Sequence, residues 1–236
     1  IHTIDYLTAN DQMPLSIIVS IESDRYKRTN EARSLLTDTN GKAHLTERYL
    51  FKELIPFAES KLRASKFRVL IGHSWFGHFT TSMFSKNSNE LNAVISLDPF
   101  FKQKNVSLTD SIEKLIISEL KYNKYYRYTI GKDYPEDFMS IKAIQNKNSN
   151  QRLDIDGKEF PNAFHNAIPG LGISEALYDV FEYWSTQHLK FFNPANKHVD
   201  IFSQLEQNIL RCDDRKLNQQ KSAYHLLIFD IDVSQT

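Results

Sequence analysis

The sequence has a single cysteine, no excess of charge of either sign and no long apolar run, and each of these excludes a class of protein. Cys212 alone cannot form an internal disulfide or a multi-cysteine metal site. The 29 basic residues balance the 29 acidic ones, so the charge does not favour a nucleic acid or an anionic membrane as partner. The apolar runs Val69–Ile71 and Leu226–Phe229 are far shorter than the roughly 20 residues of a membrane-spanning helix. A small molecule is the partner that we expect.

Two further absences concern cofactors and the start of the chain. No grouping of histidine, cysteine and carboxylate residues has the spacing of a metal site, so we expect no metal. The chain begins at Ile1 without a methionine or a signal peptide, so we expect that it was processed, trimmed or cut from a longer product. An export signal could have been lost in that way, which leaves a cytoplasmic and a periplasmic location open. The oligomeric state is equally open.

The pattern of apolar residues predicts one large α/β domain. With 236 residues, 41% of them hydrophobic, the chain can bury a sizeable core. Strand-like runs alternate with helical patterns, which indicates a mostly parallel sheet flanked by helices. We expect strands at Leu15–Ile21, Phe67–Ile71, Leu91–Leu97 and Tyr125–Ile130, and helices at Leu45–Leu62, Phe79–Phe84, Thr109–Leu120, Phe138–Ile144 and Leu177–Phe192. The polar stretch Glu22–His44 predicts a long surface loop.

The composition changes after Pro194, where glutamine, asparagine and lysine become frequent. We therefore expect a catalytic domain over residues 1–194 and a C-terminal extension over residues 195–236. The extension should contain a helix around Val199–Leu210 and a strand-like run at Ala223–Val233. That run is too hydrophobic to be left in water and should pack on this domain or on a partner. Because the candidate catalytic residues all precede the extension, we expect it to be dispensable for chemistry.

The junction after the buried run Phe67–Ile71 has the layout of a nucleophile elbow. The run ends abruptly in Gly-His-Ser, which places Ser74 on a sharp turn between a strand and a helix. The pattern Gly-x-Ser-x-Gly is only half met, because Phe76 stands where the second glycine is expected and Gly77 follows one place late. The alternative interpretation is an ordinary turn serine. Catalysis by Ser74 is the first hypothesis.

A serine hydroxyl requires a base that takes its proton and a third group that orients the base. His165 lies on a loop before the last long helix, and Asp133 follows the strand expected at Tyr125–Ile130. These positions fit the order serine, acid, histidine. The carboxylates that compete with Asp133 are Asp98, Glu136 and Asp137. The sequence predicts a triad of Ser74, His165 and Asp133, with the acid open to these alternatives.

Three segments carry a resemblance to a known family. They are Ile71-Gly72-His73-Ser74, the segment Ile-Ser-Leu-Asp-Pro-Phe-Phe that ends at Phe101, and Phe-His-Asn-Ala-Ile-Pro from Phe164, followed by Ala-Leu-Tyr-Asp-Val-Phe-Glu-Tyr-Trp. They resemble the putative-esterase family of α/β-hydrolases, which contains esterase D-like enzymes and siderophore esterases that open enterobactin- or bacillibactin-type trilactones. The resemblance covers roughly Ile1–Phe192. It implies an α/β-hydrolase-type sheet that here lacks its N-terminal strands.

The resemblance also implies roles for single residues. It makes Ser74 the nucleophile and His165 the base of a serine ester hydrolase that works through an acyl-enzyme, without a cofactor, on a carboxylic ester such as a siderophore trilactone. Asp133 lies in a Gly-Lys-Asp segment similar to that of esterase D, although some siderophore esterases manage with a weak acid or none. In the family an upstream strand ends in an Asp-Gly loop that supplies an oxyanion donor. No such segment precedes Ile1, so the backbone N–H of Trp75 is the donor that we can name.

Residues beside the elbow and on the first loop have two interpretations each. Trp75 and Phe76 are either core aromatics or an apolar wall for an acyl or aryl group. Arg25 and Arg28, with Lys27 between them, are either a solvated loop face or the cations that meet an anionic substrate such as a catecholate siderophore. For both groups the sequence leaves the choice open.

Two histidines near the elbow are expected to be structural. His73 should be a packed, hydrogen-bonded core residue, and His78 should be structural or solvent-facing.

Two other functions remain as alternatives to the ester hydrolase. One is a binding or regulatory module with weak turnover, motivated by Phe76 and by the missing N-terminal segment. The other is acyl transfer to an alcohol other than water.

Overall fold

The computed structural model describes residues 1–236 except 22–27, 197–199, 201–202, 205, 209–223 and 231–236. Its centre is a six-stranded sheet in the order β1-β8-β2-β3-β6-β7, and every pairing within it is parallel. The strands are β1 (Ser16–Ser20), β2 (Ala64–His73), β3 (Ala93–Leu97), β6 (Lys124–Gly131), β7 (Leu153–Phe160) and β8 (Tyr224–Asp230). A short antiparallel pair, β4 (Lys102–Gln103) and β5 (Val106–Ser107), stands apart from it. The expected α/β architecture with a mostly parallel sheet is confirmed.

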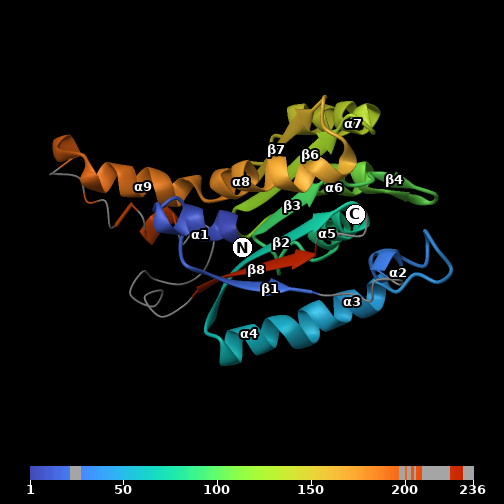
Figure 1. The fold of residues 1–236 in the computed structure, drawn as a ribbon, viewed down its shortest axis with the longest axis horizontal. Helices are drawn as coiled ribbons and strands as arrows, with labels where there is room; N and C mark the ends of the chain where they lie inside the picture. Colours follow the sequence, from blue (N-terminus) through green and yellow to red (C-terminus); the bar gives the residue numbers. More distant parts are fainter. Residues whose placement is uncertain (22–27, 197–199, 201–202, 205, 209–223, 231–236) are drawn as a thin grey trace.

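Helices cover both faces of this sheet, as parallel strands require (Figure 1). They are α1 (His2–Ala9), α2 (Arg28–Ala32), α3 (Ala43–Tyr49), α4 (Ile55–Lys61), α5 (Trp75–Lys86), α6 (Leu108–Ile116), α7 (Pro135–Lys147), α8 (Ile168–Val180) and α9 (Glu182–Phe192). A π-helical turn, Leu50–Leu54, joins α3 to α4, and 3-10 turns lie at His165–Ala167 and Pro194–Asn196. Helices α4, α5, α6 and α7 pack on one face, while α1 and α8 pack on the other.

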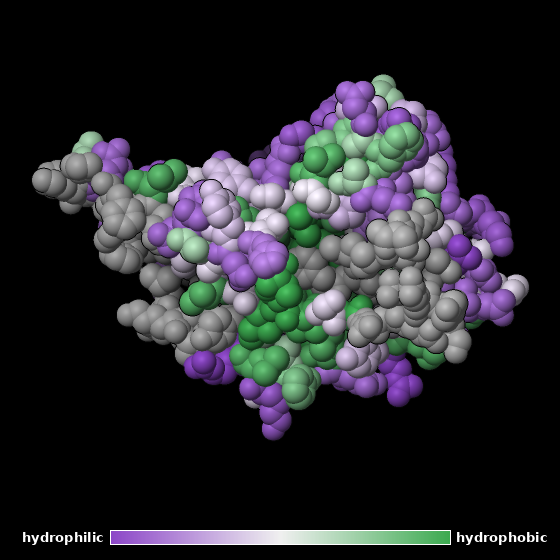
Figure 2. Space-filling view, viewed as in Figure 1, coloured by the Kyte–Doolittle hydropathy of each residue, from purple (hydrophilic) through white to green (hydrophobic). Residues whose placement is uncertain are grey.

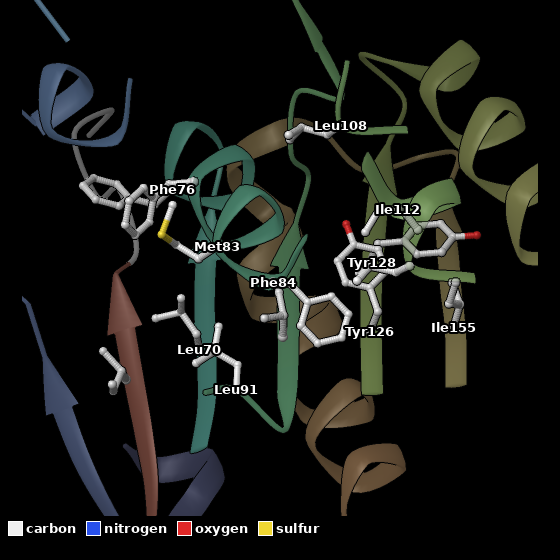
Figure 3. Packing of buried hydrophobic residues seen from close by; sticks show 14 of the residues in the cluster. Leu70, Phe76, Met83, Phe84, Leu91, Leu108, Ile112, Tyr126, Tyr128 and Ile155 are labelled. Carbon is white, nitrogen blue, oxygen red and sulfur yellow. The ribbon is translucent and has the colours of Figure 1, made fainter. Parts of the chain in front are cut away.

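The side chains of β2 point alternately to the two faces of the sheet, and each face has its own hydrophobic core. Leu70 packs toward α5, whereas Val69 and Ile71 belong to the core under α1 and α8. On the α5 side, Phe84 stacks on Tyr126 of β6 with ring centroids 5.7 Å apart (Figure 3). Side chains of period two on a strand that is buried on both faces explain why the run Phe67–Ile71 is almost continuously apolar.

Several elements differ from the sequence expectations. The loop expected at Glu22–His44 contains α2, and the single helix expected at Leu177–Phe192 is two helices, because the chain leaves helical geometry at Phe181 (φ −104°, ψ 15°). Strand β7 was not expected at all. Half of the helix expected around Val199–Leu210 lies on residues outside the described ones, and the described residues 203, 204 and 206–208 within it are helical.

Strand β8 lies inside the sheet, between β1 and β2 (Figure 1). The side chains of Leu227 and Ile228 are fully buried. The hydrophobic run near the C-terminus therefore packs on this domain, which is one of the two outcomes expected for it. A division of the chain at residue 194 would take an interior strand out of the sheet.

The far edge of the sheet is formed by β1. Figure 2 shows hydrophobic side chains gathered on the face where β1 and α4 lie, and Leu15 and Phe57 are among the exposed large hydrophobic residues. None of the helices in the described part of the chain is long and apolar enough to cross a membrane.

Candidate active site

Ser74 lies on a strained turn between the end of β2 and the first residue of α5. Its backbone has φ 60° and ψ −123°, a conformation that residues with a Cβ rarely adopt. Gly72 permits this turn, because a Cβ at that position would lie 2.3 Å from the carbonyl oxygen of Phe76. The sharp strand-to-helix turn expected from Gly-His-Ser is present in the structure.

Phe76 does not prevent the turn, although it occupies the place of the expected second glycine. Its side chain is buried and packs edge-to-face on Phe79, with ring centroids 6.2 Å apart, on the β8 side of α5 (Figure 3). The close approach that requires a small residue falls one place later. A Cβ on Gly77 would lie 3.1 Å from the Cβ of Pro99. Phe76 is a core residue in this structure, whereas Trp75 is only partly buried.

The imidazole of His165 pairs through Nδ1 with the Oδ2 of Asp98. Asp98 follows β3 directly and its side chain is fully buried. Its second carboxylate oxygen accepts a hydrogen bond from the backbone N–H of Gly131 at 2.7 Å. The backbone of Asp98 has φ 48°, a left-handed conformation that aspartate tolerates better than most residues. A buried carboxylate held on both oxygens therefore orients the histidine ring.

Asp133 contacts His165 at a different place from the one expected. Its Oδ2 accepts a hydrogen bond from the backbone N–H of His165 at 2.7 Å, and the ring is paired with Asp98 instead. The expectation of a contact between Asp133 and the ring is corrected on this point. The reason is topological: β3 lies next to β2 in the sheet, so the end of β3 comes closer to the elbow than the turn after β6 does.

The histidine ring lies beside the elbow. The rings of His73 and His165 have centroids 4.4 Å apart, and His73 directly precedes Ser74. Within the part of the chain that the structure describes, no hydrogen bond joins the Ser74 hydroxyl to the His165 imidazole. In sites without substrate such bonds are often long, and they shorten when substrate binds. Ser74 and Asp98 follow the adjacent strands β2 and β3, and the His165 ring pairs with Asp98 and lies beside His73, the residue before Ser74.

Aromatic side chains surround this group. Phe100 stacks on the His165 ring at 5.9 Å and contacts the Trp75 ring at 5.2 Å. Tyr134 approaches both Phe100 and His165 edge-on. The guanidinium of Arg33 lies 4.1 Å from the centroid of the Trp75 ring. Phe100, Tyr134 and Arg33 were not among the site residues predicted from the sequence, although Phe100 lies in a segment that carries the family resemblance.

Burial shifts two titratable groups in this region. It raises the pKa of the Tyr134 phenol, and the negative charge of Asp98 raises that pKa further. Burial also lowers the pKa of His78, whose Nδ1 lies 2.6 Å from the carbonyl oxygen of Phe100. The carbonyl can only accept, so Nδ1 of His78 carries the proton. His78 is buried and hydrogen-bonded, in line with the structural role expected for it.

The remaining candidates can be placed only in part. Arg25 lies outside the described residues, and Arg28 is the first residue of α2, with no description of its side chain. Among the described residues, no group of three or more histidine, cysteine, aspartate or glutamate residues could hold a metal ion.

Known proteins place the chain in a family. Residues 2–150 match the family described as putative esterase. None of the curated proteins matches. An IroE-like serine hydrolase from Shewanella oneidensis has 18% sequence identity and a TM-score of 0.65, over 94% of this chain and 78% of that one. The BES protein from Bacillus cereus has 19% identity and a TM-score of 0.64, over 75% of this chain and 74% of that one.

These structural similarities identify the fold as α/β-hydrolase-type, and the family match supports ester hydrolysis as the class of reaction. The match ends before His165 and extends over more than half of the chain. The chain belongs to the putative-esterase family.

Proposed function

We propose that this protein is a serine carboxylesterase with a triad of Ser74, His165 and Asp98. The observation that carries the proposal is the pair between His165 Nδ1 and the buried Asp98 carboxylate, located beside the strained turn of Ser74. In this proposal Asp98 takes the role that the sequence analysis gave to Asp133. Family membership supports the reaction class, and the geometry supports the roles of the residues.

In the first half of the reaction, the Ser74 Oγ attacks the carbonyl carbon of the ester. Nε2 of His165 takes the serine proton, and the Asp98 carboxylate stabilises the imidazolium through the Nδ1–H. The carbonyl oxygen becomes an oxyanion. Trp75 is the first residue of α5, so its backbone N–H has no partner within the helix and can donate to that oxyanion. The imidazolium then protonates the leaving alcohol, which leaves an acyl group on Ser74.

In the second half, a water molecule attacks the acyl carbon and His165 takes the water proton. The tetrahedral intermediate collapses, the proton returns to Ser74 Oγ, and the carboxylic acid leaves. Atoms balance without a cofactor. If an alcohol replaces water in this step, the same residues carry out acyl transfer.

The surroundings of the triad favour an ester with an aromatic or bulky apolar group. Phe100 and Tyr134 contact the His165 ring and Trp75 packs on Phe100, so these three residues form a partly buried aromatic wall, and the guanidinium of Arg33 lies over the Trp75 ring. A siderophore-trilactone ester with aromatic acyl groups is the substrate that we propose to test first.

A second candidate function is a hydrolase-like binding module with little turnover. The observation that favours it is that Ser74 Oγ makes no hydrogen bond to His165 among the described residues. A fluorophosphonate probe separates the two candidates, because it labels a serine only when the base activates it.

The test combines this probe with hydrolysis of short p-nitrophenyl esters. The purified protein should be labelled at Ser74, and Ser74→Ala should lose both labelling and turnover without loss of fold. Asp98→Asn should lower kcat on the order of 10³- to 10⁴-fold, because the amide cannot stabilise the imidazolium. Glu136→Gln, which removes a carboxylate on the nearby first turn of α7, is the matched control. An unlabelled, inactive wild-type protein would overturn the esterase proposal and leave the binding module as the candidate.

A further inference from the structure

His165 is held from three adjacent strand ends at once. The ring pairs with Asp98 after β3, the backbone N–H donates to Asp133 after β6, and Nε2 of His73 at the end of β2 lies 3.1 Å from the backbone carbonyl oxygen of His165. Strands β2, β3 and β6 are neighbours in the sheet. Only the contact with Asp98 is explained by the triad chemistry, so the two backbone contacts need a separate account.

The contact of His73 is a hydrogen bond from its ring to the backbone of His165. A carbonyl oxygen can only accept, so Nε2 of His73 carries a hydrogen and donates it to the carbonyl of His165. His73 is 1% exposed, and its ring lies 4.4 Å from that of His165. The donor is therefore held in the core, directly before Ser74.

The contact of Asp133 is made by an exposed side chain. Its carboxylate is exposed to solvent, whereas Asp98 is fully buried. Water screens the charge of an exposed carboxylate, so its effect on a neighbouring imidazolium is weak. A hydrogen bond of 2.7 Å to a backbone N–H, by contrast, fixes the position of the loop. The geometry gives Asp133 a positional role and not an electrostatic one.

The loop that carries His165 needs such anchors. Phe164 and Asn166 on either side of it are exposed, while His165 itself is partly buried. The backbone of this loop is also tied to the turn after β6, where the N–H of Lys132 donates to the carbonyl oxygen of Ala163 at 2.9 Å. Loops without anchors sample many positions, and a base that shifts by a fraction of an ångström loses reach to its nucleophile.

We propose that Asp133 and His73 are positioning residues that clamp the backbone of His165, one on its N–H and one on its carbonyl, so that the imidazole faces Ser74. This inference rests on the proposed function, since it assigns the clamp to the same base. In this proposal Asp98 stabilises the charge of the His165 imidazolium, whereas Asp133 and His73 fix the position of the His165 backbone.

The clamp is tested with pairs of variants that keep or remove each hydrogen bond. Asp133→Ala removes the acceptor, whereas the side-chain carbonyl of Asp133→Asn can still accept from the N–H of His165 without a charge. His73→Leu removes the donor, whereas the amide N–H₂ of His73→Gln can still donate. We expect Asp133→Ala and His73→Leu to lower kcat about five- to tenfold with little change in KM, the effect of one lost hydrogen bond. Asn and Gln should recover most of the loss.

Glu136→Gln is the matched control for charge, because it removes a nearby carboxylate that makes no hydrogen bond or ion pair with His165 in the described part of the chain. If Asp133→Asn were as damaging as Asp133→Ala, the carboxylate would act by its charge and the clamp would be wrong. If His73→Leu fails to fold, the Asp133 pair and His73→Gln still decide the question.

A second readout does not depend on catalysis. In protein labelled with ¹⁵N-histidine, the backbone amide of His165 should exchange with solvent faster in Asp133→Ala than in wild type, and Asp133→Asn should restore the slow exchange. Equal exchange in all three proteins would overturn the clamp. If the wild type neither hydrolyses esters nor reacts with fluorophosphonate, the proposed function fails, while the exchange rates still report on the clamp.

Discussion

Ser74, the proposed nucleophile, has a strained backbone conformation. Its φ of 60° and ψ of −123° lie in a region of backbone conformation that glycine adopts at little cost. For other residues this conformation costs about 1–3 kcal/mol of stability. Backbone hydrogen bonds hold the turn in place, because the N–H of Ser74 donates to the carbonyl oxygen of Leu97 at 2.9 Å and its carbonyl accepts from the N–H of His78 at 3.0 Å.

The strain can be measured with two variants that both lack the hydroxyl. Ser74→Gly should be more stable than Ser74→Ala by about 1 kcal/mol, because glycine relieves the strained φ but loses more conformational entropy on folding. Urea unfolding of the two variants gives the difference directly. A Ser74→Gly variant that is less stable than Ser74→Ala would show that the turn is not strained.

The triad predicted from the sequence and the triad proposed from the structure share Ser74 and His165 and differ in the acid, which is Asp133 in the prediction and Asp98 in the proposal. Ser74 follows from a local pattern of strand, glycine and helix, and His165 follows from the motif around it. The acid depends on which of several carboxylates meets the ring, and that is decided by the neighbour relations of β2, β3 and β6 in the sheet. Asp98 and Asp133 both follow strands and both contact His165, so spacing along the chain does not separate them.

At the scale of elements, α5 is tied to the segment after β3 by a buried histidine. His78 on α5 donates to the carbonyl of Phe100, and Phe100 stacks on His165. Burial is the main cause that lowers the pKa of His78 below its ordinary value of 6.5, and Lys86 lowers it further against the opposing effect of the hydrogen bond. Burial therefore favours the neutral form of His78, whereas the hydrogen bond from Nδ1 to Phe100 is available in both protonation states.

The burial of His78 predicts that the protein loses stability in acid. The folded-state pKa of His78 is depressed, so below pH 6.5 the unfolded state binds a proton that the folded state does not yet bind. Stability from this residue is fully present above about pH 6.5 and is lost as the pH falls through the folded-state pKa. The decrease in unfolding free energy between pH 7.5 and pH 5 should be smaller in His78→Asn, which keeps a donor for Phe100 but does not titrate.

The control is His44→Asn, which replaces an exposed histidine. Its decrease in unfolding free energy over the same pH range should match that of the wild type. If His78→Asn also matches the wild type, the buried histidine does not cause the acid sensitivity.

Strand β7 shows why one element escaped prediction while its neighbours did not. The interior strands read as continuous apolar runs because both of their faces are buried. Strand β7 is an edge strand, and only Leu153 and Ile155 of it are buried hydrophobic residues. Its exposed positions carry charges such as Asp154 and Asp156, which is a usual protection of a sheet edge. Its sequence therefore resembles that of a loop.

At the scale of the whole molecule, the order of strands ties the two ends of the chain together. Strand β8 comes from the last part of the sequence, yet it pairs with β1 on one side and with β2 on the other. The composition after residue 194 suggested a separable extension, because polar residues dominate the segment between α9 and β8. The polar composition is a property of the segment between α9 and β8. The position of β8 depends on its pairing with β1 and β2, which no local sequence pattern encodes.

The position of β8 makes the fate of a shortened chain the sharpest test of the architecture. Removal of residues 224–236 would leave β1 without a neighbour and would expose the β2 edge, together with the apolar contacts of Leu227 and Ile228. We expect the shortened chain to lose its cooperative urea transition and its near-ultraviolet circular dichroism, whereas the full chain should unfold in one transition. Ile228→Ala in the full chain should cost about 2–5 kcal/mol, against a much smaller effect of Leu189→Ala at an exposed position. A shortened chain that folds cooperatively and hydrolyses esters would show that residues 1–223 form the domain without β8 and that β8 is an accessory strand.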